Sequence, residues 1–170
     1  MKIGLIYGSS TGNTETAAYQ LKDKFEASGA SVEIHNIGAM TSEQMLGYEY
    51  MIFGIPTWNT GELQDDWAIF FPQLGNMNFA GKKVAVFGMG DQNGYGFNFL
   101  DAAGMLADEV LIQGGDLYGY WSTATYDFAE SLNTDGEFFL GLGLDNDGQE
   151  EMTEPRLNKW VSRLKEEWGF

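Results

Sequence analysis

The sequence predicts an α/β fold built on a doubly wound, five-stranded parallel sheet. Short apolar runs rich in β-branched residues alternate with longer amphipathic segments in five strand–helix units. This alternation is typical of a parallel sheet covered by helices on both faces. The chain has 170 residues, of which 44 % are hydrophobic and 15 % aromatic, enough to form one hydrophobic core. We therefore expect a single domain over residues 1–170.

The expected strands are the short runs in which apolar and β-branched residues dominate. They are Lys2–Tyr7, Ser31–Ile34, Tyr50–Gly54, Lys83–Gly88 and Asp116–Gly119. The expected helices are the longer amphipathic segments Asn13–Ser28, Ser42–Leu46, Gln64–Leu74, Phe97–Gln113 and Pro155–Trp168. Gly29 should end the first helix, and Thr153 followed by an early Pro155 should begin the last one, in line with helix-capping preferences.

Residues 120–144 depart from the alternating pattern. They are rich in turn-forming and aromatic residues, and only Phe138–Leu142 resembles a strand. We interpret residues 120–137 as an insertion that interrupts the last strand. The strand should then resume near Phe138.

The charge of the chain is strongly negative and unevenly distributed. The formal net charge is −16, and no Lys or Arg occurs from Phe25 to Gly81 or from Val84 to Pro155. Such a field repels nucleic acids and anionic membranes and attracts basic protein surfaces. The same acidity also confers solubility, so the total charge alone does not identify a partner.

Composition also limits the compartment and the chemistry. The chain has no cysteine, which excludes disulfides, thiol redox chemistry and zinc–thiolate sites. No apolar run approaches the roughly 20 residues of a membrane span, and Met1-Lys2 leads directly into a strand, leaving no room for a signal peptide. We expect a soluble protein of the cytoplasm, or of an equivalent compartment such as the plastid stroma after processing.

Three unusual loops follow the first, third and fourth expected strands. They are residues 8–14 (GSSTGNT), 56–63 (PTWNTGEL) and 88–99 (GMGDQNGYGFNF). In a doubly wound sheet these loops meet at the carboxyl edge, where ligands bind. Trp58 in the second loop and Tyr95 in the third are each more typical of ordinary core or surface aromatics. As a pair at this edge, they could enclose a flat ring.

The first loop is best explained as a phosphate-binding loop. A simple strand-to-helix turn accounts for one of its hydroxyl residues and one of its glycines. A loop that wraps a phosphate accounts for all of them, because glycines allow close backbone approach and the next helix directs its N-terminus at the anion. Neither Gly-Lys-Ser/Thr nor G-x-G-x-x-G is present at the required position. The phosphate would therefore serve as an anchor and not as a reacting group.

Together these motifs resemble those of the flavodoxins, specifically the long-chain group, over nearly the whole chain. The matching segments are GSSTGNT, PTWNTGELQDDW, GDQNGYGFNF, the insertion, and LGLDNDGQ before the last helix. The resemblance implies strand order 2-1-3-4-5 and one non-covalently bound FMN. It also implies a low-potential one-electron carrier that shuttles between semiquinone and hydroquinone, with no catalytic or metal-binding residues. The implied partners are ferredoxin-NADP reductase and, in a phototroph, photosystem I, and we expect a monomer.

The resemblance also implies a set of cofactor-binding residues. Trp58 and Tyr95 would flank the isoalloxazine ring, and Asp147 would lie near the ribityl chain. The phosphate would be held by Ser9, Ser10, Thr11, Gly12, Asn13 and Thr14, and the polar edge of the ring would meet Pro56, Thr57, Asn59, Thr60, Gly61, Gly90, Asp91 and Asn98. Some relatives carry a basic residue where this chain has Asn13, so here the phosphate would depend on N–H groups, hydroxyls and the helix end.

Other functions fit the sequence less well. An NAD(P)H-dependent FMN or quinone reductase of the same fold needs an open ring face and a cation for the nucleotide phosphates, and these loops contain no Lys or Arg. A receiver domain needs acidic residues where this chain has Gly8-Ser9 and Gly54-Ile55. The acidic segment 145–151 is not a calcium loop, because Gly148 is its fourth residue and not its sixth. The single histidine, His35, is expected away from the three loops.

The second loop generates a prediction about redox tuning. In relatives the semiquinone is favoured when a peptide beside flavin N5 reorients to offer its carbonyl, and here that peptide would be Asn59-Thr60. Glycine accepts positive φ at little cost, whereas Thr60 would be strained. We expect Thr60→Gly to raise the oxidised/semiquinone midpoint potential in a redox titration; an unchanged potential would contradict this.

Overall fold

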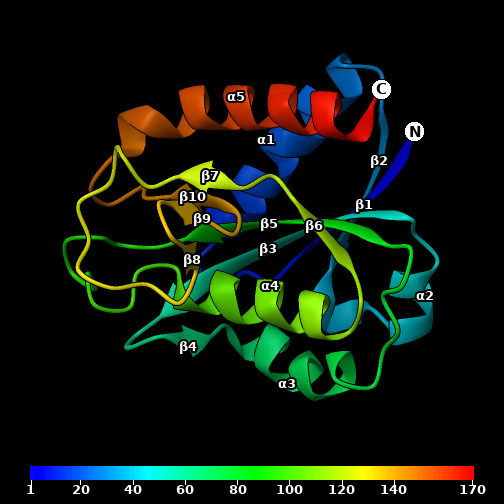
Figure 1. The fold of residues 1–170 in the computed structure, drawn as a ribbon, viewed down its shortest axis with the longest axis horizontal. Coiled ribbons are helices and arrows are strands. Elements are labelled where there is room, and N and C mark those ends of the chain that lie inside the picture. Colours follow the sequence, from blue (N-terminus) through cyan, green and yellow to red (C-terminus); the bar gives the residue numbers. More distant parts are fainter.

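The protein is built around a central sheet whose strands follow the order β10-β5-β3-β1-β2, as a computed structural model of residues 1–170 shows (Figure 1). The main strands are β1 (Lys2–Tyr7), β2 (Ser31–Asn36), β3 (Tyr50–Trp58), β5 (Lys83–Met89) and β10 (Leu142–Leu144). All of their pairings are parallel. A further strand, β6 (Asp116–Tyr118), pairs with the first half of β5, and β10 pairs with its second half. The predicted order 2-1-3-4-5 is confirmed, with the fifth strand divided into β6 and β10.

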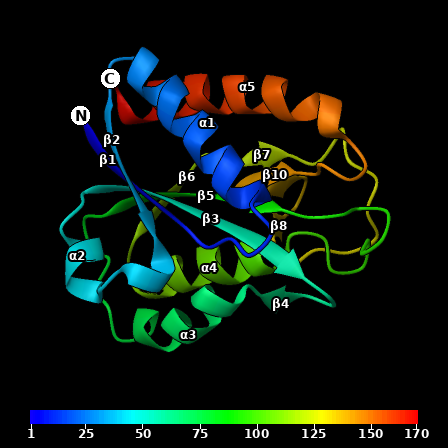
Figure 2. The same cartoon turned by 180° about the vertical axis from the view of Figure 1, so that it is seen from behind.

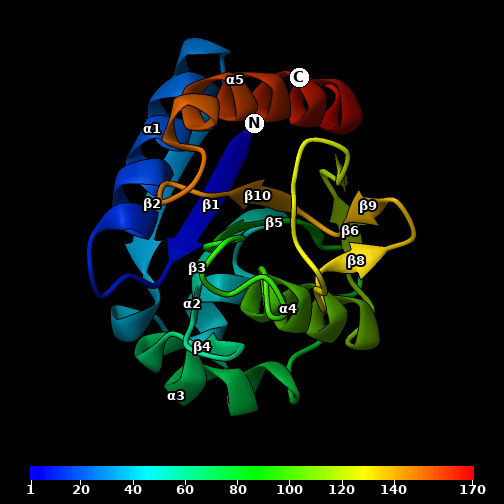
Figure 3. The ribbon, with the colours of Figure 1, turned by 90° about the vertical axis from the view of Figure 1, so that its left-hand side faces the viewer.

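Helices cover both faces of this sheet (Figures 2 and 3). One face is covered by α1 (Asn13–Ala27) and α5 (Glu150–Trp168), the other by α3 (Asp65–Leu74) and α4 (Asp101–Ile112). The short elements η1 (Ile37–Ala39) and α2 (Ser42–Leu46) follow β2. None of these helices has the length and apolarity needed to cross a membrane.

Side chains alternate between the two hydrophobic cores along each strand. On β1, Leu5 belongs to the core beneath α1 and α5, whereas its neighbour Ile6 belongs to the core above α3 and α4. On β3, Ile52 and Phe53 divide in the same way. Successive residues of a strand point to opposite faces, and a sheet covered on both sides buries both sets. The continuous apolar runs in the sequence follow from this burial.

Strand β3 extends four residues beyond its predicted end. Beyond Gly54 it continues to Trp58 and forms an antiparallel hairpin with β4 (Glu62–Leu63), in which Thr57 pairs with Leu63 and Trp58 with Glu62. The predicted second loop is therefore a hairpin that projects from the carboxyl edge of the sheet.

Two helix starts differ from the prediction by four residues or more, and α3 begins one residue late, at Asp65 with Gln64 as its N-cap. Helix α4 begins at Asp101 and not at Phe97, because Leu100 has φ +60° and cannot continue a helix backwards. Helix α5 begins at Glu150, so Pro155 lies inside the helix and does not mark its first turn. Proline lacks the N–H that would bond to the carbonyl four residues earlier, and Pro155 lies beyond the first four residues whose N–H groups are unpaired anyway, so α5 lacks one backbone hydrogen bond there.

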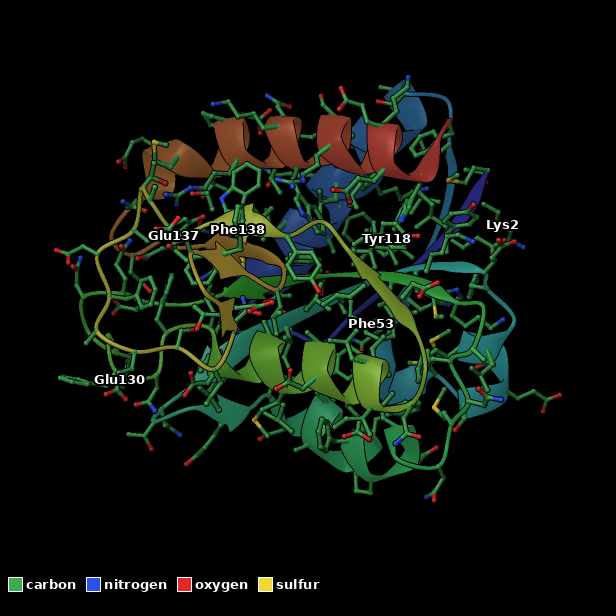
Figure 4. The ribbon with its side chains drawn as sticks, viewed as in Figure 1. Lys2, Phe53, Tyr118, Glu130, Glu137 and Phe138 are labelled. Atoms are coloured by element: carbon green, nitrogen blue, oxygen red, sulfur yellow. The ribbon has the colours of Figure 1, made fainter.

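The insertion forms a small antiparallel sheet of its own. Its strands β7 (Trp121–Ser122), β9 (Phe138–Phe139) and β8 (Thr134–Asp135) pair in that order. The prediction that the last strand resumes near Phe138 is therefore wrong. Phe138 pairs with Ser122 and Asp135, and the parallel sheet resumes only at Leu142. Both Phe138 and Glu137 are labelled in Figure 4.

The close packing of β3 against β5 generates a stability prediction. A Cβ atom at Gly54 would overlap the ring of buried Phe87. Because overpacking a core costs about 1–3 kcal/mol, we expect Gly54→Ala to lower the free energy of unfolding by about 2 kcal/mol in urea titrations of the apoprotein. Gly75→Ala is the matched control. The backbone there has φ −63°, and a Cβ would meet its nearest atoms at 3.6 Å, so a large loss in this variant would contradict the packing explanation.

Candidate functional site

A cavity of about 370 Å³ opens at the carboxyl edge of the central sheet. Its walls come from the start of α1, the β3–β4 hairpin, the loop after β5 and the loop between β10 and α5. The lining residues are Thr11, Asn13, Thr14, Pro56, Thr57, Trp58, Asn59, Met89, Gly90, Asp91, Tyr95, Asn146 and Asp147. The three loops singled out in the sequence therefore meet at one site, together with a fourth.

Most of the predicted binding residues line this cavity, and a few do not. Ser9, Ser10, Gly12, Thr60, Gly61 and Asn98 lie outside its lining. Conversely, Met89 and Asn146 line it and were not predicted. Met89 is the last residue of β5 and lies within the predicted third loop, and Asn146 is the neighbour of the predicted Asp147, but neither was named as a binding residue. His35 lies elsewhere, on strand β2, where its Nε2 is 2.6 Å from the hydroxyl of Tyr48.

The first loop leaves the N-terminus of α1 free of a side-chain cap. Gly12 occupies the cap position with φ +96°, a conformation that glycine adopts readily. Ser9 Oγ accepts a hydrogen bond from the Gly12 N–H at 3.1 Å, which shapes the loop. The amides in the first turn of a helix have no partner within the helix and attract anions. The loop is thus suited to bind an anionic group.

Two of the four hydroxyl residues in this loop accept hydrogen bonds from other groups of the protein. Ser9 bonds as described, and Ser10 Oγ accepts from Nε2 of Gln64 at 3.1 Å. Gln64 is buried at the start of α3, where its Oε1 also accepts the N–H of Trp67. Only a glycine fits at position 8, because a Cβ there would overlap Gln64 and Trp67. Thr11 and Thr14 line the cavity itself.

The hairpin that carries Trp58 has its backbone strain at Asn59. Asn59 has φ +47° and Gly61 has φ +95°, whereas Thr60 does not have positive φ. The strain expected at Thr60 is therefore absent in this conformation. An effect of Thr60→Gly would require φ at Thr60 to change when the cofactor is reduced. Asn is among the residues that tolerate the left-handed region best.

The loop that carries Tyr95 is held in shape by Asp91. Oδ1 of Asp91 accepts the N–H of Asn93 at 3.1 Å and of Gly94 at 2.8 Å, and its carbonyl accepts the N–H of Tyr95 at 2.9 Å. This turn keeps Tyr95, which is 47 % exposed, at the wall of the cavity.

Asn98 supports the site from behind and does not line it. Its Nδ2 donates to Oδ2 of Asp101 at 3.1 Å, and a Cβ on Gly61 would lie 2.8 Å from the same oxygen. Thr57 Oγ1 also accepts the N–H of Ala102 at 3.1 Å. The hairpin is thus packed against the start of α4.

Electrostatically, the cavity is acidic. Its lining contains the carboxylates of Asp91 and Asp147 and no Lys or Arg. Burial, and then the nearby Glu15 carboxylate, raise the pKa of Tyr7, the last residue of β1 before the first loop. Lys2 and Lys83 stand at the opposite, amino ends of their strands, paired with Glu33 and Glu49. In Figure 4, Lys2 and Glu130 accordingly lie at opposite ends of the molecule.

Comparison with known proteins decides the family. The sequence profile of the flavodoxins matches residues 5–160. The chain belongs to the flavodoxin family. It is therefore an FMN-binding electron carrier and not an enzyme, as the motifs predicted, and nothing in the comparisons favours the reductase alternative.

Similar proteins cover almost the full chain. A flavodoxin of Nostoc sp. is 44 % identical over 169 residues, which are 99 % of this chain and 98 % of the relative. A flavodoxin of Synechocystis sp. is 48 % identical over 164 residues, 96 % of each chain. Among solved structures, Fusobacterium nucleatum flavodoxin bound to flavin mononucleotide superimposes with a TM-score of 0.92 at 26 % identity, covering 98 % of both chains.

Proposed function

We propose that the cavity holds FMN with its phosphate on residues 9–14 and its ring between Trp58 and Tyr95, and that the protein carries single electrons at low potential. The observation that supports this most directly is the composition of one cavity. It combines the uncapped start of α1, two aromatic residues from separate loops, and carboxylates without any basic residue. Its volume of about 370 Å³ lies within the usual range for small-molecule sites, about 300–1,000 Å³.

At the phosphate end, binding would depend on neutral donors. Thr11, Asn13 and Thr14, at the uncapped start of α1, line the cavity and would offer their N–H groups and hydroxyls to the phosphate. Several N–H donors at a helix N-terminus can hold a phosphate without a cation. This arrangement anchors the cofactor and adds no positive charge near its ring.

At the ring end, Trp58 and Tyr95 would cover the two faces of the flavin. Stacking of this kind adds about 0.5–1.5 kcal/mol per pair beyond area burial. Backbone groups of Asn59, Gly90 and Asp91 lie on the same walls and can bond to the polar edge of the ring. The polar side chains of Asn146 and Asp147 are available to the ribityl chain.

The acidic lining would keep the potential low. Bound FMN supplies the one-electron chemistry, and its full reduction adds negative charge to the ring. Asp91 and Asp147 in the lining, with Glu62 on the hairpin, oppose that added charge. For a one-electron couple, about 1.4 kcal/mol of repulsion corresponds to about 59 mV, so a few kcal/mol makes the reduced protein a strong donor.

The same acidic end would dock redox partners. Flavodoxins exchange electrons with partner proteins, and for this chain we propose ferredoxin-NADP reductase and, in a phototroph, photosystem I. Tyr95 and Phe97, the latter 70 % exposed, provide an apolar centre, and Asp91 and Glu62 an acidic rim. A basic docking face would complement this surface. We further propose a monomeric, single-domain protein that works in the cytoplasm or plastid stroma.

Removing one hydroxyl from the phosphate loop tests the anchoring role. We expect Thr11→Val to weaken FMN binding about tenfold, because a hydrogen bond to a charged group contributes about 1.5–3 kcal/mol. Both midpoint potentials should stay within about 20 mV, since a shift of that size corresponds to less than about 0.5 kcal/mol. Fluorescence titration of the apoprotein and anaerobic stepwise reduction measure the two quantities.

Thr11→Ser is the control, because it keeps the hydroxyl and should bind FMN like the parent protein. The opposite pattern, with shifted potentials and unchanged affinity, would show that the loop tunes redox chemistry. In the parent protein, a second midpoint potential as high as that of free FMN would refute the low-potential proposal.

Partner docking generates a dependence on ionic strength. We expect the rate of electron transfer to a reductase with a basic docking face to fall as salt rises from 0.01 to 0.3 M, since added ions screen the attraction between the surfaces. Stopped-flow absorbance measures this rate. Oxidation by a small neutral quinone is the control and should not change. A partner rate that is independent of salt would contradict acidic docking.

A further inference from the structure

A buried polar pair lies behind the cavity and takes no part in its lining. Asp145 is 0 % exposed and Gln92 is 4 % exposed. One oxygen of Asp145, Oδ1, accepts the N–H groups of Asp147 at 3.1 Å and Gly148 at 2.8 Å. The other, Oδ2, accepts the backbone N–H of Gln92 at 3.1 Å and its side-chain Nε2 at 2.7 Å. Four N–H donors therefore surround this carboxylate.

This arrangement joins two walls of the cavity. Asp147, one of the donors to Oδ1, lines the cavity from the loop after β10, and Asp91 and Tyr95 line it from the loop around Gln92. A buried carboxylate is costly unless its lone pairs are satisfied, so both loops must keep their positions for Asp145 to stay bonded. A fully satisfied buried network of this kind specifies one geometry.

The insertion holds the same loop from its other side. The N–H of Asp127 donates to Oε1 of Gln92 at 2.6 Å. The carbonyl of Gly96, the residue after Tyr95, accepts the N–H groups of Ala129 at 2.8 Å and Glu130 at 2.9 Å. Residues 127–130, which we call the brace, thus contact the loop on both sides of Tyr95.

Aromatic packing reinforces the brace. Phe128 lies 5.6 Å from Phe99, ring centre to ring centre, and Tyr126 and Phe139 pack against Phe99 at 5.8 and 5.9 Å. Phe99 ends the loop that carries Tyr95. The loop is therefore fixed at Gln92, at Gly96 and at Phe99, all by residues outside the cavity.

We propose that Gln92 and Asp145 are positioning residues which, with the brace, preset the Tyr95 loop for the cofactor before it binds. A loop that is already ordered loses less conformational entropy on binding, and affinity rises accordingly. This role also gives the insertion a purpose within the protein. The inference rests on the proposed function, in which FMN occupies the cavity.

The direct test is Gln92→Met, which keeps the length of the side chain and the backbone N–H bond to Asp145 but removes the side-chain bonds to Asp145 and Asp127. We expect FMN to bind about tenfold more weakly, equivalent to about 1.4 kcal/mol. We also expect the amides of residues 93–97 to exchange hydrogen faster in the apoprotein. Gln113→Met is the matched control. Gln113 Nε2 donates to Glu109 Oε1 at 2.9 Å on α4, away from the cavity, and its loss should change neither measurement.

A swapped pair tests the contact itself. Gln92→Glu places two carboxylates together, and Asp145→Asn directs an amide at the donors of Gln92, so each should weaken FMN binding by tenfold or more. Gln92→Glu combined with Asp145→Asn restores one donor–acceptor pair between the side chains. Its loss of affinity should therefore be smaller than the product of the two single losses. Losses that simply multiply would overturn the proposed pairing.

The unmodified protein provides a test that no folding defect can obscure. The amides of Asp127, Ala129 and Glu130 should exchange slowly in the apoprotein. Fast exchange there would mean that the brace is not formed before binding, and would overturn the proposal. So would a Gln92→Met variant that is less stable but binds FMN with unchanged affinity and unchanged exchange at 93–97.

The outcomes also separate this inference from the proposed function. If Thr11→Val and Tyr95→Ala weaken FMN binding and Gln92→Met does not, the cavity is the cofactor site and only the positioning role is wrong. If none of the three variants affects affinity, the cofactor binds elsewhere and both proposals are wrong.

Discussion

Parallel pairing of β3 with β1 on one side and β5 on the other is the constraint on which the site depends. Parallel strands all end at the same edge of the sheet, so the loop that follows each strand begins there. The chain then needs a crossover connection to reach the opposite edge, where the next strand starts. The loops after Tyr7, Trp58 and Met89 therefore meet at one edge although they are far apart in the sequence. Phosphate anchoring and ring stacking are combined in one cavity because the sheet brings their loops together.

The parallel direction of the strands also separates the basic residues from the acidic edge of the sheet. Lys2 and Lys83 are paired with Glu33 and Glu49 at the amino ends of their strands, so they neutralise little of the charge at the other edge. The one buried basic residue of α5, Arg156, lies over the ring of Tyr126, 4.0 Å from its centre, and bonds to Gln149 at 2.6 Å. The acidic edge is thus left without cations in its lining. An electron donor and a surface that attracts basic partners both benefit from this separation.

The sequence was most informative where local chemistry determines structure. The bounds of β1 and α2 were predicted to the residue: an apolar run leads into Gly8 in the first case, and Thr41 and Gln44 form a capping box in the second. It was least informative where distant contacts decide. Helix α5 starts before Pro155, and Phe138 pairs within the insertion and not with β5. No local pattern announces either outcome, because both depend on which partner the segment meets in three dimensions.

In the site, too, some residues could be predicted from the sequence and others could not. Gln64, Gln92 and Asp145, which hold the loops from behind, lie within the recognised motif segments, but nothing in those segments marked them as supporting residues. Each is a polar residue buried within or beside a loop, and neither periodicity nor capping preference marks such a position. Contacts between loops far apart in the chain are visible only once the sheet has brought them together.

The division of the last strand into β6 and β10 has an evolutionary consequence. Tyr118 pairs with Ala85 and Leu142 with Phe87, so the chain leaves and re-enters the sheet two positions apart on β5, about 7 Å at the usual rise per residue. A segment whose ends lie this close can be gained, lengthened or lost without changing strand order, and the entropy of closing such a loop grows slowly with its length. The architecture thus allows an accessory module to be added beside an existing cofactor site, and to diversify there while the sheet itself stays the same.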